Sequence, residues 1–115
     1  MDIQVERRQQ ALVISLAGSF DALTAGEAER TIGMHLDTGQ QTVVLDLSQV
    51  DFMSSSGIRV LLTLLKKSRS LGGGFCLAAP QPGVQHTLEI AGLVRVLQVY
   101  PSLEEAVRSF NPPAP

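Results

Sequence analysis

The chain has 115 residues, of which 44% are hydrophobic and 17% charged, and nine Lys and Arg against eleven Asp and Glu give a net charge of −2. This length fits one domain, and this hydrophobic content excludes disorder over the whole chain. The charge lacks the basic footprint of a nucleic-acid-binding protein, and four Phe and one Tyr are too few for a platform that stacks bases.

Membrane, export and metal signals are also missing from the sequence. No apolar run approaches the ~18–20 residues of a membrane span, and the first eight residues (MDIQVERR) lack the apolar core of a secretion signal. The single cysteine, Cys76, cannot form an internal disulfide and fits a reducing compartment. His35 and His86 have no neighbour at metal-ligand spacing. We therefore expect a cytoplasmic protein without metal, cofactor, nucleic-acid partner or membrane insertion.

The first third of the chain predicts two strands and a helix. Alternating apolar residues predict strands over 3–8 and 11–17, joined by a tight turn at residues 9–10. A helix is predicted over 22–36, because apolar residues spaced for one face begin at Leu23. Thr24 and Glu27 have the spacing of a capping box for this helix.

The middle of the chain predicts a buried strand, a loop and a strongly apolar helix. The near-continuous apolar run TVVLDL over 42–47 is typical of a parallel strand that is buried on both faces. Asp46 interrupts this run, so we expect its carboxylate to meet backbone or water. Residues 48–53 are predicted as a loop, followed by a helix over 58–71 for which Ser54 or Ser55 supplies the N-cap.

The last third of the chain predicts two more strands and two more helices, in the order strand, helix, strand, helix. The strands are expected over 75–79 and 94–99, with a short helix over 84–91 between them. Ser102 opens a terminal helix with the spacing of a capping box. The resulting order β-β-α-β-α-β-α-β-α indicates an α/β sandwich with right-handed crossovers.

Two polar clusters follow predicted strands, at the edge where ligands and partners of such sheets tend to bind. They are GSFD at 18–21 and DFMSSSG at 51–57. One helix cap explains one serine of the second cluster, but it does not explain three. A phosphate on Ser56 would lie in the favourable field of a helix N-terminus and add about −1.5 to −2 charge units. If a partner buried this surface against apolar or acidic groups, the removal of water from that charge would cost much of the free energy of binding.

Catalysis is the weaker interpretation of these serines. The cluster lacks the Gly-x-Ser-x-Gly elbow of serine hydrolases, and the glycines at 72–74 follow a helix instead of opening one. We therefore expect no enzyme. A hydrolase that pairs one of these serines with distant His35 or His86 is the remaining catalytic alternative.

Three segments of the chain resemble the STAS domain, the anti-sigma factor antagonist family. GSFDALTA at 18–25 is similar to the family's G-x-(L/F)-D-x-x-(T/N)-A turn. VVLDLSQVDFMSSSGI at 43–58, the most specific segment, is similar to a strand h-h-x-D-h-S followed by x-V-x-F-h-D-S-S-G-h. A weaker match runs over 75–93, and the resemblance as a whole spans about 3–110.

The resemblance implies a STAS-type sandwich, with a mixed sheet of about five strands and about four helices. The first strand pair would be antiparallel and the later strands parallel. Residues 1–110 would form the single STAS domain, and the Pro-rich residues 111–115 (NPPAP) a projecting tail.

The resemblance also implies a partner-switching protein. The unphosphorylated form would bind an anti-sigma factor that is a serine kinase of the GHKL ATPase type. That kinase would phosphorylate Ser56, the serine directly before the glycine, and so end the complex, while a PP2C-type phosphatase would restore it. The residues expected to contact the partner are Asp21, Met53, Ser54, Ser55, Gly57 and Ile58.

One departure from the family pattern leaves alternatives open. The family usually has an aspartate two residues before the phosphoserine, where this chain has Ser54. Ser54 or Ser55 are therefore alternative phosphoacceptors. The departure also motivates a second hypothesis, a STAS scaffold that is never phosphorylated and belongs to a stressosome-type complex or a transporter.

Overall fold

The computed structural model describes residues 1–38 and 42–110, which form a five-stranded sheet, four α-helices and a 3-10 helix. The expected sandwich of about five strands and about four helices is therefore confirmed. The predicted tail, residues 111–115, lies outside the described residues. The elements are β1 (Asp2–Arg8), β2 (Ala11–Phe20), α1 (Ala25–Leu36), β3 (Thr42–Met53), α2 (Ser55–Ser70), β4 (Gly74–Ala78), α3 (Pro82–Ile90), η1 (Leu93–Arg95), β5 (Gln98–Tyr100) and α4 (Leu103–Arg108).

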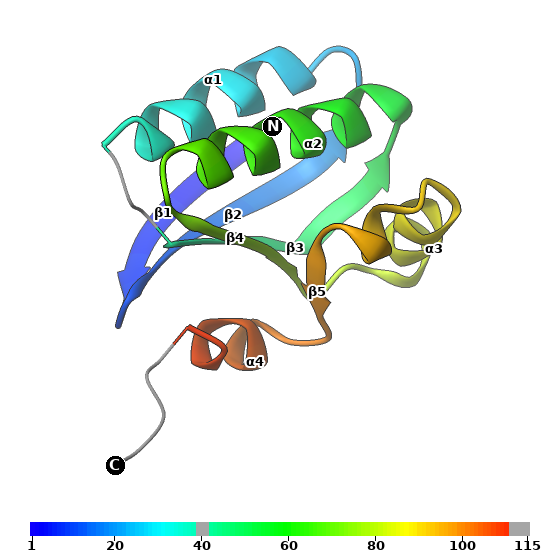
Figure 1. The fold of residues 1–115 in the computed structure, drawn as a ribbon. Coiled ribbons are helices and arrows are strands. Elements are labelled where there is room, and N and C mark those ends of the chain that lie inside the picture. The colour runs from blue at the N-terminus through cyan, green and yellow to red at the C-terminus, as the bar shows by residue number, and fades with distance from the viewer. Residues whose placement is uncertain (39–41, 111–115) are drawn as a thin grey trace.

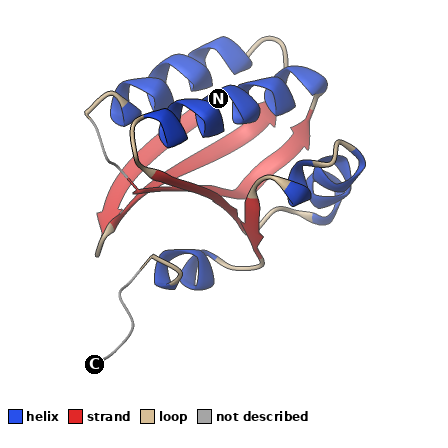
Figure 2. Cartoon of the chain, viewed as in Figure 1, coloured by secondary structure: helices blue, strands red, loops and turns tan. Residues whose placement is uncertain are grey.

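The strands lie in chain order, β1-β2-β3-β4-β5. β1 and β2 are antiparallel and joined by the predicted two-residue turn, whereas each later neighbouring pair is parallel. Figures 1 and 2 show α1 and α2 side by side over one face of the sheet and α4 on the opposite face. None of the described helices is long and apolar enough to cross a membrane.

The sheet separates two hydrophobic cores, one under each helical layer. The larger core joins the α1 and α2 side of the sheet to α3 and η1, and includes Leu45, Leu61 and Leu88. The smaller core lies under α4 and includes Cys76, whose side chain is 1% exposed. Burial raises the pKa of the Cys76 thiol to about 12.

One polar contact ties the edge strand to the α4 layer. The Arg8 guanidinium donates a hydrogen bond to Glu104 Oε2 at 2.9 Å, which links β1 to α4. This hydrogen bond and the adjacent positive charge lower the pKa of Glu104.

The two central strands extend further than the sequence predicted. β2 continues to Phe20, and the predicted loop at 48–53 is the second half of β3. The prediction was wrong because two register shifts, between Ser15 and Ala17 and between Gly18 and Ser19, break the alternation of buried and exposed residues. The predicted role of Asp46 is confirmed, since its Oδ1 accepts a hydrogen bond from the Ser48 backbone at 3.0 Å where the first shift occurs.

The first helix begins later than predicted. α1 starts at Ala25, so Leu23 lies in the preceding turn and is 94% exposed instead of buried on the helix face. Thr24 occupies the N-cap position, but its side chain makes no capping hydrogen bond. Its hydroxyl instead donates to the Ser19 carbonyl at 2.7 Å and accepts from the Asp21 backbone at 3.0 Å. The expected capping box with Glu27 therefore does not form.

The C-terminal strand is also shorter than predicted. Residues 93–95 form η1, and only Gln98–Tyr100 pair with β4. Gly92, with φ of 76°, precedes this turn; Leu93 and Leu97 are buried in the larger core, and Val99 packs against it. The last helix begins as predicted, because the Ser102 hydroxyl accepts from the Glu105 backbone at 3.2 Å.

Candidate functional site

The candidate site lies where β2 and β3 end side by side. Phe20 and Met53, the last residues of the two strands, are paired in the sheet. The Ser54 backbone N–H then donates to the Phe20 carbonyl at 2.9 Å, which holds the two exits from the sheet together. The two polar clusters that the sequence singled out are thus brought to one edge of the molecule.

The three serines take different places at the start of α2. Ser54 is the N-cap, as predicted for one of the serines, and its hydroxyl accepts from the Ser56 backbone at 3.2 Å. Ser55 is exposed, and Ser56 is partly exposed. Within the described chain the hydroxyls of Ser55 and Ser56 make no hydrogen bond to protein atoms. Only the cap serine is therefore engaged in holding the fold.

A close backbone contact explains the glycine after the serines. A Cβ at Gly57 would lie 2.8 Å from the Phe20 carbonyl oxygen, and 3.2 Å from Met53 Cγ. No other side chain fits without moving this backbone, so glycine lets the first turn of α2 rest directly on the end of β2. The position of Ser56 is therefore fixed by the sheet beneath it.

Asp21 organises the turn that faces the serines. Its Oδ1 accepts from the Leu23 backbone at 2.9 Å, and its carbonyl accepts from the backbones of Thr24 and Ala25 at 3.1 and 2.8 Å. Asp21 is partly exposed. The side chain thus stabilises the turn before α1 while it borders the serine cluster.

Burial divides the predicted partner-contact residues into two groups. Asp21, Ser54, Ser55 and Ile58 are exposed or partly exposed, whereas Met53 is 3% exposed and Gly57 is buried. That Met53 and Gly57 contact a partner stays a prediction, and in the free chain both are covered by neighbouring residues. Met53 and Gly57 pack beneath the accessible residues and hold them in position.

Two exposed apolar side chains at the same edge were missed in the sequence. Leu23, in the Asp21 turn, is 94% exposed, and Phe52, near the end of β3, is 54% exposed. Large apolar side chains that face water next to a polar cluster are typical of interaction surfaces. Phe52 stands in the quoted motif, but its outward direction depends on the shifted register of β3, and the exposure of Leu23 depends on where α1 begins.

The charge around the serines is uneven. α2 has no acidic residue in its first turn, so the partial positive charge of its N-terminus is not neutralised from the helix itself. The nearest acid along the chain is Asp51, whose carboxylate accepts a hydrogen bond from the Ser19 hydroxyl at 3.1 Å. An anion placed at Ser56 would therefore meet a favourable helix end with no acid on its own turn.

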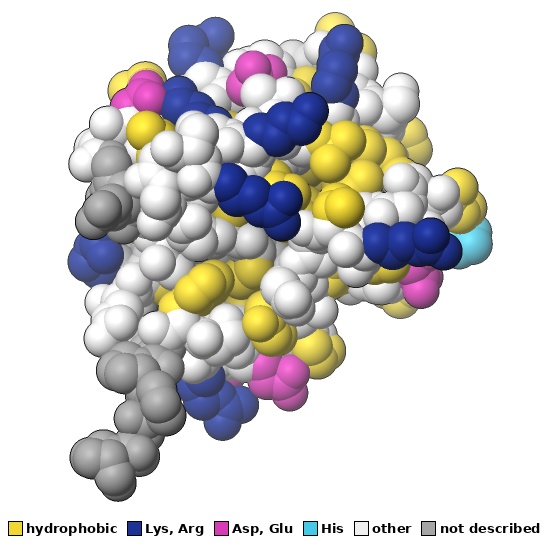
Figure 3. Space-filling model, in the orientation of Figure 1, with side chains coloured by type: hydrophobic (Ala, Val, Ile, Leu, Met, Phe, Trp, Pro, Cys, Tyr) yellow, Lys and Arg dark blue, Asp and Glu magenta, His cyan; other side chains and the backbone are white. Residues whose placement is uncertain are grey.

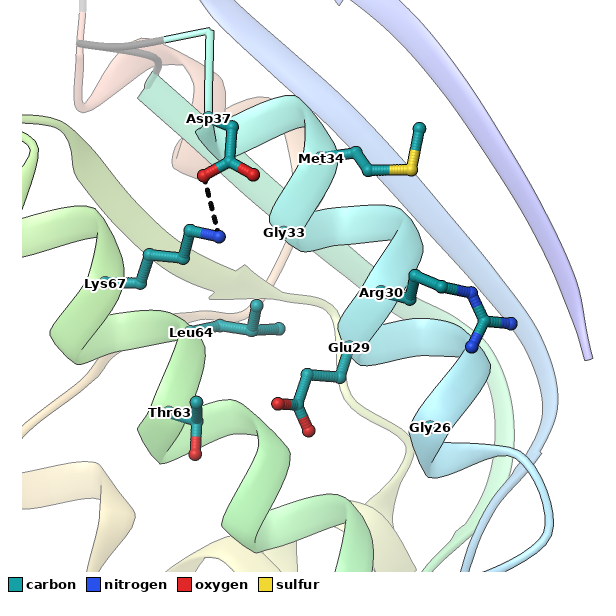
Figure 4. Close-up of a pocket in the computed structure, with 9 residues that line it drawn as sticks. All are labelled: Gly26, Glu29, Arg30, Gly33, Met34, Asp37, Thr63, Leu64 and Lys67. Carbon is teal, nitrogen blue, oxygen red and sulfur yellow. Dashed lines mark ion pairs between the residues drawn. The ribbon is translucent and has the colours of Figure 1, made fainter.

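A groove elsewhere on the surface offers no comparable chemistry. It has a volume of about 510 Å³ and lies between α1 and α2, away from residues 54–58 (Figure 4). Lys67 Nζ and Asp37 Oδ1 pair across it at 2.8 Å. Figure 4 shows Arg30 and Met34 pointing away from the groove, so its cationic side chains do not converge on one ligand.

Comparisons with known proteins place the chain among similar domains. A model of the STAS domain matches residues 2–106. The chain is 30% identical over 115 residues to BtrV of Bordetella bronchiseptica, a candidate anti-sigma factor antagonist by its name, and the match covers 100% of this chain and 99% of BtrV.

Solved structures agree with this assignment. The crystal structure of an anti-sigma factor antagonist from Mycobacterium paratuberculosis superimposes with a TM-score of 0.87 at 29% identity, covering 94% of this chain and 92% of the other. The anti-sigma factor antagonist SpoIIAA shares the fold both in its unphosphorylated form, with a TM-score of 0.77 at 24% identity, and in its phosphorylated form from Bacillus, with 0.72 at 22% identity. Each SpoIIAA match covers 96% of this chain and 100% of SpoIIAA.

Proposed function

Because the chain belongs to the STAS domain family, we propose that it is an anti-sigma factor antagonist whose binding is switched by phosphorylation of Ser56. The unphosphorylated form binds an anti-sigma factor that is a serine kinase of the GHKL type. That kinase phosphorylates Ser56, which ends the complex, and a PP2C-type phosphatase removes the phosphate. The relatives named as anti-sigma factor antagonists support this assignment.

The observation that carries the proposal is the state of the Ser56 hydroxyl. It is partly exposed, makes no hydrogen bond to the described protein atoms, and stands at the N-terminus of a 16-residue helix. A kinase needs access to such a hydroxyl, and a phosphate there gains from the helix dipole. Because the hydroxyl holds nothing together, its modification leaves the fold in place. SpoIIAA, a fold neighbour, is recorded with and without phosphate, which agrees with this reasoning.

The surface around Ser56 explains why the phosphate would end binding. Ser55, Ile58 and Leu23 give the partner a surface that combines a hydroxyl with apolar side chains that are exposed or partly exposed. A partner must remove water from these groups when it docks. Phosphate carries about −1.5 to −2 charge units, and its desolvation costs several kcal/mol unless the partner supplies cations. The complex therefore loses affinity while each protein stays folded.

Phosphate mapping tests this proposal. The protein is incubated with its cognate anti-sigma factor and ATP, and the modified residue is located by peptide mass spectrometry. We expect phosphate on Ser56 in the parent chain and in the variants Ser54→Ala and Ser55→Ala, and no phosphate in Ser56→Ala. An unmodified parent chain, beside a control substrate that the same kinase does phosphorylate, would refute the switch.

The residue at position 54 favours a second candidate function. Where the family pattern has an aspartate, this chain has Ser54, which serves as the cap of α2. A scaffold that is never phosphorylated, in a stressosome-type complex or attached to a transporter, needs that cap but not a kinase recognition element. Co-purification with membrane transport components, together with an absence of phosphoserine in cells, would favour the scaffold.

A further inference from the structure

The surface beside α2 is strongly cationic, although the molecule as a whole is acidic. Residues 52–88 contain Arg59, Lys66, Lys67 and Arg69 but no Asp or Glu, while the whole chain has a net charge of −2. Arg95 adds a fifth positive charge from η1. More than half of the nine basic residues therefore belong to one helix and the short turn beside it.

Apolar side chains lie among these cations. Val94 and Val96 are 41% and 46% exposed, and Leu62 of α2 is only partly buried. The Arg69 guanidinium donates to the Val96 carbonyl at 3.0 Å, which fixes the chain after η1 against α2. Figure 3 shows an apolar area on this side of the molecule with Lys and Arg side chains around it. We call Leu62, Val94, Val96, Lys66, Arg69 and Arg95 the α2–η1 patch.

The cations of the patch are not used within the protein. Among residues 1–38 and 42–110, no ion pair or hydrogen bond engages the side chain of Lys66 or Arg95, and Arg69 spends one donor on a backbone carbonyl. Arg59 continues the same helix face toward Ser56, because residues 59, 62, 66 and 69 have the spacing of neighbours along one side of a helix. The patch is therefore continuous with the site that contains Ser56.

An interface of ordinary size that is centred on Ser56 would include the α2–η1 patch. Stable complexes bury about 800 Å² on each partner, which corresponds to a disc with a radius of roughly 16 Å. Lys66 lies ten residues after Ser56 in α2, which is about 15 Å along a helix. A partner centred on Ser56 that makes an interface of this size reaches the patch.

We infer that the partner covers the α2–η1 patch with an acidic amphipathic segment, whose apolar side chains meet Leu62 and Val96 and whose carboxylates meet Lys66 and Arg95. This inference rests on the proposed function for the position of the partner. A lipid surface fits less well, because the exposed apolar residues of the patch are the short side chains of Val94 and Val96 and it contains no Trp or Phe, whereas membrane-surface helices are rich in large apolar side chains.

Charge reversal with a matched control tests the inference. The variant Lys66→Glu/Arg95→Glu changes the patch, and Arg30→Glu/Arg108→Glu reverses two exposed cations elsewhere, so both have the same net charge. Affinity for the cognate anti-sigma factor is measured by calorimetry at low and high salt. We expect the patch variant to bind at least 10-fold more weakly and with less dependence on salt, and the control to stay within 2-fold of the parent. Equal affinities of the two variants would overturn the inference while leaving the proposed function intact.

If the parent chain does not bind that anti-sigma factor, the proposed function is refuted. A second measurement then still tests the inference about the α2–η1 patch. The ¹⁵N-labelled protein is titrated with a synthetic amphipathic peptide that has Glu on one face and Leu on the other. Shifts at residues 62, 94 and 96 that are lost in the patch variant support the inference, and shifts elsewhere or none contradict it. Binding of the parent chain, but not the patch variant, to vesicles of phosphatidylcholine and phosphatidylglycerol would overturn the assignment to a protein partner. If the charge-reversed variant Lys66→Glu/Arg95→Glu does not fold, the neutral variant Lys66→Gln/Arg95→Gln takes its place, and we expect it to show an intermediate loss of affinity.

Discussion

At the residue scale, Ser56 differs from its neighbour Ser54 in what its hydroxyl contacts. Ser54 caps α2 through its hydroxyl, while the hydroxyl of Ser56 makes no contact that the described fold requires. The same residue type therefore has a structural role at one position, while two residues later its hydroxyl makes no hydrogen bond to the described protein atoms. The sequence predicted that one of the serines would be a cap, but the capping geometry was needed to say which.

Substitutions at Ser56 are expected to separate binding from switching. Ser56→Asp places a charge at the centre of the proposed docking surface and should weaken binding to the anti-sigma factor at least 10-fold, or about 1.4 kcal/mol. Ser56→Ala should bind like the parent chain and persist in the complex when ATP is added. Calorimetry measures both. Gln10→Asp, at the exposed β1–β2 turn, adds the same charge far from the site and should change nothing; an equal loss in this control would contradict the account.

Gly57 is expected to be intolerant of even one added carbon. In Gly57→Ala the Cβ would lie 2.8 Å from the Phe20 carbonyl, so the first turn of α2 has to shift, at a cost of about 1–3 kcal/mol in unfolding free energy. Gly26→Ala is the matched control, because no atom lies within 4 Å of its Cβ and alanine favours the helix. Urea denaturation of both variants checks this. Equal stability of Gly57→Ala and the parent chain would show that the contact is not tight.

At the scale of the element, α2 owes its beginning to Ser54. Ser54→Ala removes the acceptor for the Ser56 backbone and should lower stability by about 0.5–2 kcal/mol. Ser54→Asp, which introduces the residue of the family pattern, retains a cap and adds a favourable charge to the helix N-terminus, so stability should match or exceed that of the parent. Thermal unfolding followed by circular dichroism measures both changes. A Ser54→Ala variant as stable as Ser55→Ala would show that the cap is dispensable.

Local pattern predicted the order and type of most elements but not their ends. The apolar runs at 11–17 and 42–47 are strands, as expected, yet both strands continue to the site edge. Their second halves contain polar residues and two register shifts, and a shift depends on pairing with another strand. The spacing at 94–99 likewise suggested a strand where the chain first turns through η1. The pairing of strands that are distant in the sequence decides where these elements end. A short stretch of sequence carries no information about that pairing.

At the scale of the whole molecule, the sheet shields Cys76 beneath α4. With 1% exposure and a pKa raised to about 12, this thiol should not react with a thiol reagent such as DTNB at pH 8 in the folded protein, and should react fully in denaturant. The unfolded thiol ionises near pH 9 whereas the buried one stays neutral to about pH 12, so this group lowers stability as pH rises through that interval. The free energy of unfolding, measured by denaturation of the parent chain and of Cys76→Ala between pH 8 and 10, should therefore depend on pH with different slopes in the two proteins. Rapid labelling of the native protein would contradict the described packing.

The candidate site also shows what a sequence can and cannot predict about function. Motif and helix position were enough to select Asp21, Ser55, Ser56 and Ile58, all of which are accessible. Met53 and Gly57 were chosen from the same motif, but three-dimensional packing places them in the interior. The exposed Leu23 and Phe52 were missed for the opposite reason, since apolar residues within a periodic pattern are normally expected to be buried.

The most direct test compares the two covalent states of one protein. Chain phosphorylated on Ser56 and unmodified chain are each titrated with the anti-sigma factor, and their ¹H–¹⁵N spectra are recorded in parallel. We predict at least a 10-fold loss of affinity on phosphorylation, with spectral changes confined to the turn at 20–23 and the start of α2. Equal affinity of the two forms, or a spectrum that changes throughout the sheet, would contradict the claim that a single phosphate blocks docking on an intact fold.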